Sequence, residues 1–226
     1  MRVLVTGSSG HLGEGLTRAL RDSEHEVVGL DILQSPFTTC IGSITDRSCV
    51  SRCLKGVRVV FHTATAHKPH IATHSPQYFA YADANIKVNE YLFRRVDLED
   101  VVNAHLLAAR RAPITGFRRY IISATTPFSP RDLPILRTDA SLATRRLVPD
   151  YEAEYARRGW KMVRSIDRVY VNERARNELG WQPQYDFKFL IDRLRADEDI
   201  RSPLARLVGS KGYHAEKFTD GPYPVK

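Results

Sequence analysis

The sequence predicts an α/β protein whose core is a doubly wound parallel sheet. Two observations predict this fold. Val3–Val5 is a short apolar run that a glycine-rich turn and an amphipathic helix follow, and strand and helix patterns go on alternating as far as residue 66. A short unbroken apolar run is typical of a strand buried on both faces, and the alternation favours parallel strands with right-handed crossovers. At 226 residues the chain is long enough to bury a full core.

The turn after the first strand carries glycines at every third position, namely Gly7, Gly10 and Gly13. The first glycine lets the strand turn sharply, the second lets a pyrophosphate approach the backbone, and the third lets the helix pack closely on the sheet. Free N–H groups at the start of the helix and the positive end of its dipole favour bound phosphate. We interpret the turn as a dinucleotide site, with an ordinary strand–helix turn as the less favoured alternative.

A second strand is predicted at His25–Leu30, and it ends in Asp31. This aspartate lies about 20 residues after the turn, where a carboxylate accepts hydrogen bonds from the adenosine ribose hydroxyls. Its charge would repel the 2′-phosphate of NADP, and no arginine immediately follows it. The sequence therefore favours NAD over NADP.

The spacing Thr-Gly-x-x-Gly-x-x-Gly over residues 6–13 resembles that of the short-chain dehydrogenase/reductase superfamily, and specifically its extended branch of NAD-dependent sugar epimerases and dehydratases. Four further segments resemble the same branch: Gly42–Asp46 after the third strand, Val59–Thr65 at the fourth, Arg95–Val102, and Arg168–Trp181. The resemblance implies a shortened Rossmann-type parallel sheet with a small C-terminal remnant of the substrate domain.

The resemblance also implies NAD as the cofactor and a set of residues that hold it. The glycine turn and Asp31 would hold the ADP half, the segment after the third strand would lie by the adenine, and the end of the fourth strand would pass the cofactor. The predicted cofactor-binding residues are Gly7, Ser9, Gly10, His11, Leu12, Gly13, Asp31, Ile32, Ser43, Ile44, Thr63, Ala64 and Thr65. Ser43 stands where the family usually has an aspartate.

The resemblance fails in the middle of the chain. The family's catalytic Tyr-x-x-x-Lys and its partner Ser or Thr belong between the fourth strand and the segment that begins at Arg95. Since a βα crossover unit takes about 30 residues or more, the chain after Thr65 has no room for the central units, and we expect them to be missing near residues 77–84. One Tyr-x-x-x-Lys occurs at Tyr213–Lys217, in the C-terminal tail, where chance is the favoured explanation.

No catalytic residue is therefore assigned. Ser123 and Thr125 follow the late helix, so a structural role is favoured over a catalytic one. By resemblance the chain is an NAD-dependent epimerase/dehydratase-like oxidoreductase acting on a small molecule, a nucleotide sugar or related polyol. The alternative is a non-catalytic NAD-binding paralogue or an internally deleted product. Hydride transfer with a sugar nucleotide would favour the first, and cofactor binding without turnover the second. A homodimer is one expected assembly.

Three regions are predicted along the chain. Residues 1–125 form the NAD-binding domain, residues 126–200 the small C-terminal segment, and residues 201–226 a tail rich in Gly, Pro and Lys. Outside the strands already given, hydrophobic spacing and turn residues predict helices over 46–55, 78–93, 98–110, 150–158, 172–179 and 186–194, and a strand over 117–123.

Charge and composition narrow the classes of partner. The net charge is +8, but arginines are dispersed in pairs, so an anionic small molecule or a generally basic surface is favoured over nucleic acid. No apolar run approaches the roughly 18 residues of a membrane span. The first residues lead directly into a strand, which argues against a signal peptide and for a cytoplasmic protein.

One group of residues raises the question of a metal ion. His67, His70 and His74 lie close in sequence, but Pro69 argues against a helix through them, and a loop lining the substrate cleft is favoured. The three cysteines are expected to be free cytosolic thiols, because a disulfide between positions four apart in one helix would constrain little. No metal site is predicted.

Overall fold

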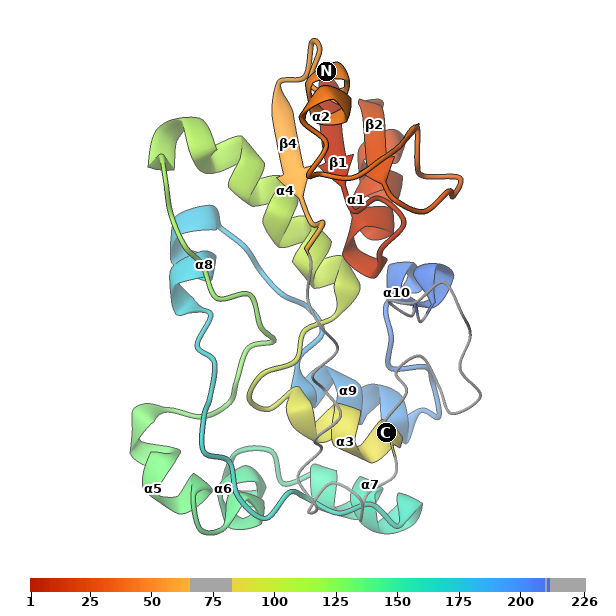
Figure 1. Ribbon diagram of the computed structural model, residues 1–226. Helices are drawn as coiled ribbons and strands as arrows, with labels where there is room; N and C mark the ends of the chain where they lie inside the picture. Colours follow the sequence, from red (N-terminus) through yellow and green to blue (C-terminus); the bar gives the residue numbers. More distant parts are fainter. Residues whose placement is uncertain (66–82, 210, 212–226) are drawn as a thin grey trace. The chain divides into compact units, whose positions relative to one another are not determined.

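The computed structural model describes residues 1–65, 83–209 and 211. The chain divides into two compact units, the first of Met1–Thr73 with Pro203–Lys226 and the second of His74–Ser202. Figure 1 colours both units along the sequence. The boundaries predicted after residues 125 and 200 stay predictions.

The first unit is built on a sheet of four parallel strands. The strands are β1 (Arg2–Thr6), β2 (Glu26–Asp31), β3 (Cys40–Ile41) and β4 (Val59–His62), in the order β3-β2-β1-β4. Thr6 stands opposite Leu30 of β2 and opposite His62 of β4, so the carboxyl ends of the three longer strands meet at one edge (Figure 1). The structure confirms the predicted parallel α/β fold of the Rossmann type.

Burial explains why β1 lies inside the sheet. The side chains of Val3, Leu4 and Val5 are at most 1% exposed, as expected for a strand covered on both faces. Two helices connect the strands, α1 (His11–Asp22) and α2 (Arg47–Cys53). The Asp46 carboxylate caps α2 by accepting the backbone N–H groups of Ser48 and Cys49.

The C-terminal segment of this unit corrects part of the prediction of a tail. Residues Pro203–Val208 form helix α10, which contacts α1. Proline suits the first position of a helix, and Gly209, with φ of +68°, suits its end. Val208 is buried and gives this short helix an apolar anchor.

The regular elements among the described residues of the second unit are all helices. Its helices are α3 (Asp83–Glu90), α4 (Leu98–Thr115), η2 (Pro130–Asp132), α5 (Leu133–Leu136), α6 (Ala140–Leu147), α7 (Tyr151–Arg158), α8 (Glu173–Leu179) and α9 (Phe187–Arg195). Helix α9 contacts α3 and α7 (Figure 1), and aromatic side chains fill the core between them: Tyr151 stacks edge-on against Tyr155, and both rings approach Phe187.

The strand predicted over residues 117–123 is wrong, because this segment is irregular in the structure. A strand needs a hydrogen-bonded neighbour, and the described residues of the second unit contain none. The side chain of Phe117 is 83% exposed and that of Ile121 is 49% exposed, so the apolar run is not packed into a sheet. Helix α4 continues past the predicted end at Arg110 as far as Thr115, and Gly116 follows with φ of +62°.

Within residues 1–65, 83–209 and 211, no helix combines the length and the apolar character that crossing a bilayer requires.

Candidate dinucleotide-binding site

The glycine turn has the backbone geometry that its three glycines suggest. Gly7 has φ of +74°, and a Cβ atom on it would lie 2.7 Å from the backbone nitrogen of Ala64. A Cβ atom on Gly13 would lie 1.9 Å from the carbonyl oxygen of Gly7, so the start of α1 contacts the turn directly. Gly10 is the extended N-cap residue of α1. The turn therefore presents the first N–H groups of α1 beyond the end of β1.

The turn lies where the strand order reverses. From β1 the chain first adds β2 on one side and later returns to add β4 on the other. Hydrogen bonds tie the ends of β1 and β4 together: Thr6 Oγ1 lies 2.7 Å from His62 Nδ1, and the hydroxyl of Thr63 donates to the carbonyl oxygen of Thr6 over 2.7 Å. In open α/β sheets, ligands bind beyond the carboxyl ends of the strands at such a reversal.

Asp31 is tied to the glycine turn through its carboxylate. Oδ2 accepts the backbone N–H of Ser9 over 2.9 Å, and Oδ1 accepts the backbone N–H of Leu33 over 2.9 Å. A carboxylate has about four acceptor positions, so each oxygen keeps capacity for a further donor. The half-buried carboxylate is thus held in one orientation beside the turn and stays able to accept hydroxyl groups.

The structure contains a network of hydroxyl groups beside the turn, which the sequence analysis did not predict. Ser9 Oγ lies 3.0 Å from the carbonyl oxygen of Leu33, 2.9 Å from Ser35 Oγ and 2.8 Å from Thr38 Oγ1. Gly29 lets this loop cross β2 closely, since a Cβ atom there would lie 1.8 Å from the carbonyl oxygen of Phe37. A glycine inside a strand pattern is a known signal of close backbone approach, and it could have indicated this loop.

Lys211 is a second residue that sequence reasoning missed. Its ammonium group donates to the carbonyl oxygen of Ser9 over 2.9 Å and forms an ion pair with Glu14. Glu14 is 4% exposed in the first turn of α1 and also pairs with Arg18 over 2.8 Å. Because 202 residues separate Lys211 from Ser9, no local pattern could have predicted this contact.

The remaining predicted residues are distributed around the same edge and on the β3–α2 turn. His11 and Thr65 are exposed, and Ile32 is 69% exposed just after β2. Ser43 makes local bonds, since its Oγ accepts the backbone N–H of Thr45 over 3.1 Å. Leu12 is half-buried at the start of α1, and Ile44 is 39% exposed beside Ser43. The structure thus joins Ser9 to Asp31, and Thr63 and Ala64 to the first glycine.

The hydroxyl groups that could be mistaken for catalytic ones have structural partners in the second unit. Ser123 is buried, and its hydroxyl donates to the carbonyl oxygen of Tyr170 over 3.4 Å. The backbone carbonyl oxygen of Ser123 accepts the Asn172 side-chain amide over 2.8 Å. The same amide donates to Thr125 Oγ1 over 3.1 Å. These bonds are consistent with a structural role for both residues.

The buried tyrosines do not have the lowered pKa that proton transfer by a phenol requires. Burial raises the pKa values of Tyr91, Tyr151 and Tyr155, and it raises the pKa of Tyr185 to about 12. A catalytic Tyr beside a Lys would show the opposite shift. Tyr213–Lys217 and the three histidines weighed as metal ligands (His67, His70 and His74) lie outside the described residues, as does most of the proposed deletion point, residues 77–82.

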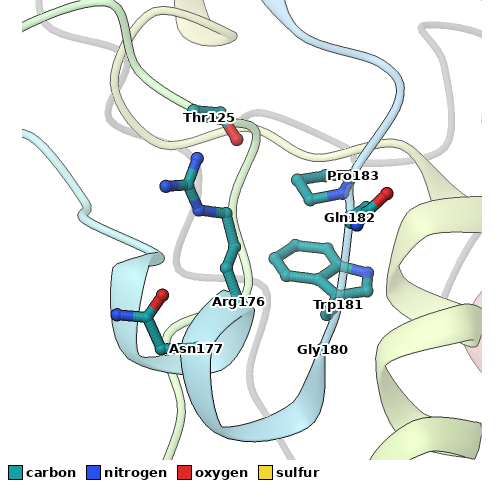
Figure 2. Close-up of a pocket in the computed structure, with 7 residues that line it drawn as sticks. All are labelled: Thr125, Arg176, Asn177, Gly180, Trp181, Gln182 and Pro183. Carbon is teal, nitrogen blue, oxygen red and sulfur yellow. The ribbon is translucent and has the colours of Figure 1, made fainter.

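A pocket of about 310 Å³ lies in the second unit. Figure 2 shows Arg176 and Trp181 on opposite sides of it. Its lining residues are Thr125, Arg176, Asn177, Gly180, Trp181, Gln182 and Pro183. Most of the lining belongs to α8 and to the segment that follows it.

Comparison with known proteins finds a family match in the first part of the chain. Residues 3–97 match the model of the NAD dependent epimerase/dehydratase family. This part of the chain is similar to that family over 95 residues, less than half of the chain. The 3-beta-hydroxysteroid dehydrogenase of Mycolicibacterium neoaurum is 41% identical over 69 residues, which are 28% of this chain and 19% of that protein. An uncharacterized protein of Mycobacterium bovis is also 41% identical over 69 residues, 8% of its length. The match thus spans about a fifth or less of these relatives.

Two solved structures share the fold of this chain. A short-chain dehydrogenase/reductase superfamily protein from Agrobacterium tumefaciens, solved with bound NAD, aligns with a TM-score of 0.53 and 15% identity. That alignment covers 87% of this chain and 95% of the other. The UDP-N-acetylglucosamine 4-epimerase of Bacillus cereus aligns with a TM-score of 0.52 and 10% identity, over 87% of this chain and 98% of that one. At these identities the likeness shows the fold.

Proposed function

We propose that the first unit binds NAD, with the glycine turn on the pyrophosphate and Asp31 on the adenosine ribose. The observation that carries the proposal is the hydrogen bond from the Ser9 N–H to Asp31 Oδ2. It links the end of β1 to the end of β2, so the positions for pyrophosphate and ribose are held in fixed relation. The bound NAD of the Agrobacterium tumefaciens protein, which has the same fold, supports this choice of cofactor.

The other predicted residues complete the proposed site. His11 and Leu12 open the first turn of α1, whose free N–H groups suit a phosphate. Ile32 and Ile44 are exposed apolar side chains that suit the faces of an adenine ring, and Ser43 offers a hydroxyl beside Ile44. Thr63, Ala64 and Thr65 follow β4 at the strand reversal and would line the path of the cofactor.

NAD is proposed over NADP because the Asp31 carboxylate is held beside the turn. Its two backbone hydrogen bonds leave it little freedom to turn away from a 2′-phosphate. Repulsion between the two negative charges would then disfavour NADP.

For activity we propose cofactor binding without hydride transfer. The sequence supports this choice, because the Tyr-x-x-x-Lys that would transfer the proton does not occur between β4 and Arg95. The second candidate is an epimerase/dehydratase-like oxidoreductase acting on a nucleotide sugar or related polyol. The family match over residues 3–97 and the sugar-nucleotide epimerase of the same fold favour it. The homodimer also stays a proposal.

Calorimetric and thermal-melting titrations with NAD and NADP test cofactor binding. At 100 times its dissociation constant, NAD should add about 2.7 kcal/mol of stability, and NADP should add less. Gly10→Val should abolish NAD binding by blocking the pyrophosphate. Asp31→Asn should weaken NAD binding and reduce the preference over NADP, whereas Asp22→Asn, an exposed aspartate at the end of α1, serves as the matched control and should bind normally.

Two results would contradict the proposal. One is an unchanged NAD affinity in folded Gly10→Val, and the other is no binding by the unaltered chain. Turnover is tested separately, by following nicotinamide absorbance and product formation with UDP-N-acetylglucosamine and related sugar nucleotides. Turnover above the no-protein background would favour the oxidoreductase, and binding without turnover would favour the non-catalytic protein.

A further inference from the structure

The three cysteines of the chain converge at one place in the first unit. Cys40 begins β3, and Cys49 and Cys53 lie on successive turns of α2. The three sulfur atoms all lie within 4.8 Å of one another, and the Sγ atoms of Cys40 and Cys49 are 3.3 Å apart. All three are free thiols, as the sequence analysis expected, but their convergence was not expected.

Packing explains only part of this arrangement. Cys49 and Cys53 are 1% and 4% exposed within an apolar cluster, and a free cysteine often serves as a small buried apolar residue. Cys40 comes from a different element and is partly exposed, so burial does not account for its position. Gly42 also makes room for the group, because a Cβ atom there would lie 2.5 Å from Cys49 Sγ.

We propose that Cys40, Cys49 and Cys53 bind one thiophilic metal ion, and that the ion is Cu⁺. Three sulfur ligands at about 2.3 Å around a trigonal ion would stand about 4 Å from one another. The observed separations, from 3.3 Å between Cys40 and Cys49 up to the 4.8 Å limit, bracket this value. Small changes of side-chain torsion would therefore bring the sulfurs to bonding distance.

The number and chemistry of the three sulfur ligands determine which metal ion suits the site. Soft thiolate ligands favour Cu⁺ and Zn²⁺ among the biological metals. A structural Zn²⁺ site takes four protein ligands, and among the described residues no fourth cysteine, histidine or carboxylate joins this group. Cu⁺ is satisfied by three. Each thiol that becomes a ligand gives its proton to the solvent, and the copper enters and stays in the +1 state, so no electron is transferred.

The proposed metal site does not depend on the proposed NAD site. It lies between β3 and α2, and the turn that joins them carries Ser43 and Ile44. A bound ion would tie the two elements together across this turn. Loss of metal binding and loss of NAD binding are measured separately, so one can fail without the other.

The test uses the full chain, reduced and desalted under nitrogen. Cu⁺ is supplied as its complex with the chromogenic chelator bicinchoninate, and the protein should remove one Cu⁺ per chain. X-ray absorption of the loaded protein should then show sulfur ligands alone, three in number. Zn²⁺, supplied with a zinc-sensitive dye, should bind more weakly than Cu⁺.

Variants assign the ligands. Cys40→Ser, Cys49→Ser and Cys53→Ser should each lower the Cu⁺ affinity by at least about 100-fold, more than the loss of a group that merely supports a ligand. Ser51→Ala, an exposed residue on α2, is the matched control and should bind normally. Circular dichroism checks folding, and Cys40→Ser, the partly exposed position, keeps the test informative if a buried variant does not fold.

Three outcomes would overturn the proposal. These are a stoichiometry other than one Cu⁺ per chain, an affinity that Cys40→Ser leaves unchanged, and tighter binding of Zn²⁺ than of Cu⁺.

Discussion

The contacts that stabilise each of the two units span different distances in the sequence. In the first unit, a parallel sheet pairs β1 with β2 and β4, and a turn of three glycines joins β1 to α1. In the second unit, helices pack around aromatic side chains, and buried polar groups join segments far apart. The Asp100 carboxylate accepts the backbone N–H groups of Gln184 and Tyr185. The backbone carbonyl oxygen of Asp100 accepts the indole N–H of Trp181.

This difference explains why the sequence of the first unit indicates its structure more clearly than the sequence of the second unit does. The glycine turn is a local pattern whose meaning follows from backbone sterics. The bond between Asp100 and Tyr185 spans 85 residues, and the bond from the Tyr155 hydroxyl to Asn89 spans 66. Nothing in the neighbourhood of Asp100 indicates its partner, and its place in the first turn of α4 could be explained by the helix dipole alone.

Cysteine and tryptophan residues allow the unfolding of each unit to be followed separately. The chain has three cysteines, all in the first unit, and two tryptophans, Trp160 and Trp181, both in the second. Thiol reactivity toward a disulfide reagent therefore follows unfolding of the first unit, and tryptophan fluorescence follows unfolding of the second.

The largest expected effect is in the second unit. Trp181 is 1% exposed, and Trp181→Ala should lower the free energy of unfolding by about 3–5 kcal/mol by leaving a cavity and removing the indole hydrogen bond to the backbone carbonyl oxygen of Asp100. Denaturant titration followed by the fluorescence of Trp160 measures it. Trp160→Ala, at a half-buried position, should cost less. Equal shifts in the thiol and fluorescence transitions would show that the two units unfold as one.

The next effect is a dependence on pH. Burial raises the pKa of Asp100 to about 6 from its ordinary value of 3.8, against the opposing hydrogen bonds from Gln184 and Tyr185. The folded chain then binds more protons than the unfolded chain between these values. This contribution to stability is fully present below about pH 4 and is lost as the pH rises through 6, by up to about 3 kcal/mol.

Fluorescence-monitored denaturation at pH 4.5 and 6.5 measures this difference. Asp100→Asn should remove it, since an amide does not titrate in this range, although the substitution should also destabilise the second unit at both pH values. Asp167→Asn, at an exposed position, is the control and should keep the pH dependence. The explanation is wrong if Asp100→Asn retains the full difference.

A smaller effect is expected in the first unit. Gly13→Ala places a Cβ atom 1.9 Å from the carbonyl oxygen of Gly7, and a clash of backbone with backbone cannot be relieved by a side-chain rotation. The loss should be about 1–3 kcal/mol, as for overpacking elsewhere. Gly10→Ala, whose Cβ atom would lie 3.1 Å from the same oxygen, should cost less. Thiol reactivity measures both losses of stability. A larger loss in Gly10→Ala than in Gly13→Ala would contradict this geometry.

The smallest effects compare one helix cap in each unit. The Asp186 carboxylate accepts the backbone N–H of Phe189, and Asp186→Ala should lower stability by about 1 kcal/mol in the fluorescence transition. Asp46→Ala should loosen the start of α2 and make Cys49 react faster with the thiol reagent. An unchanged thiol rate in Asp46→Ala would mean that this cap does not control the start of α2.

Comparison of sequence and structure shows what local patterns can predict. Strand β1 and the glycine turn each depend on residues within a few positions of one another, and the sequence predicts them. The strand expected over residues 117–123 depends on a partner, and apolar residues alone cannot supply one. Helix α10 was missed because its few apolar residues gain stability only from contact with α1.

The sequence by itself determined the parallel sheet of the first unit and the conformation of its glycine turn, because these follow from backbone sterics and short-range burial. Only the tertiary structure decided that Lys211 reaches Ser9, that three thiols converge, and that Asp100 is buried beneath the segment around Gln184. Each of these joins elements that are separate along the chain. The free energy of such a contact depends on where the fold brings both partners, and neither partner's sequence neighbourhood carries that information.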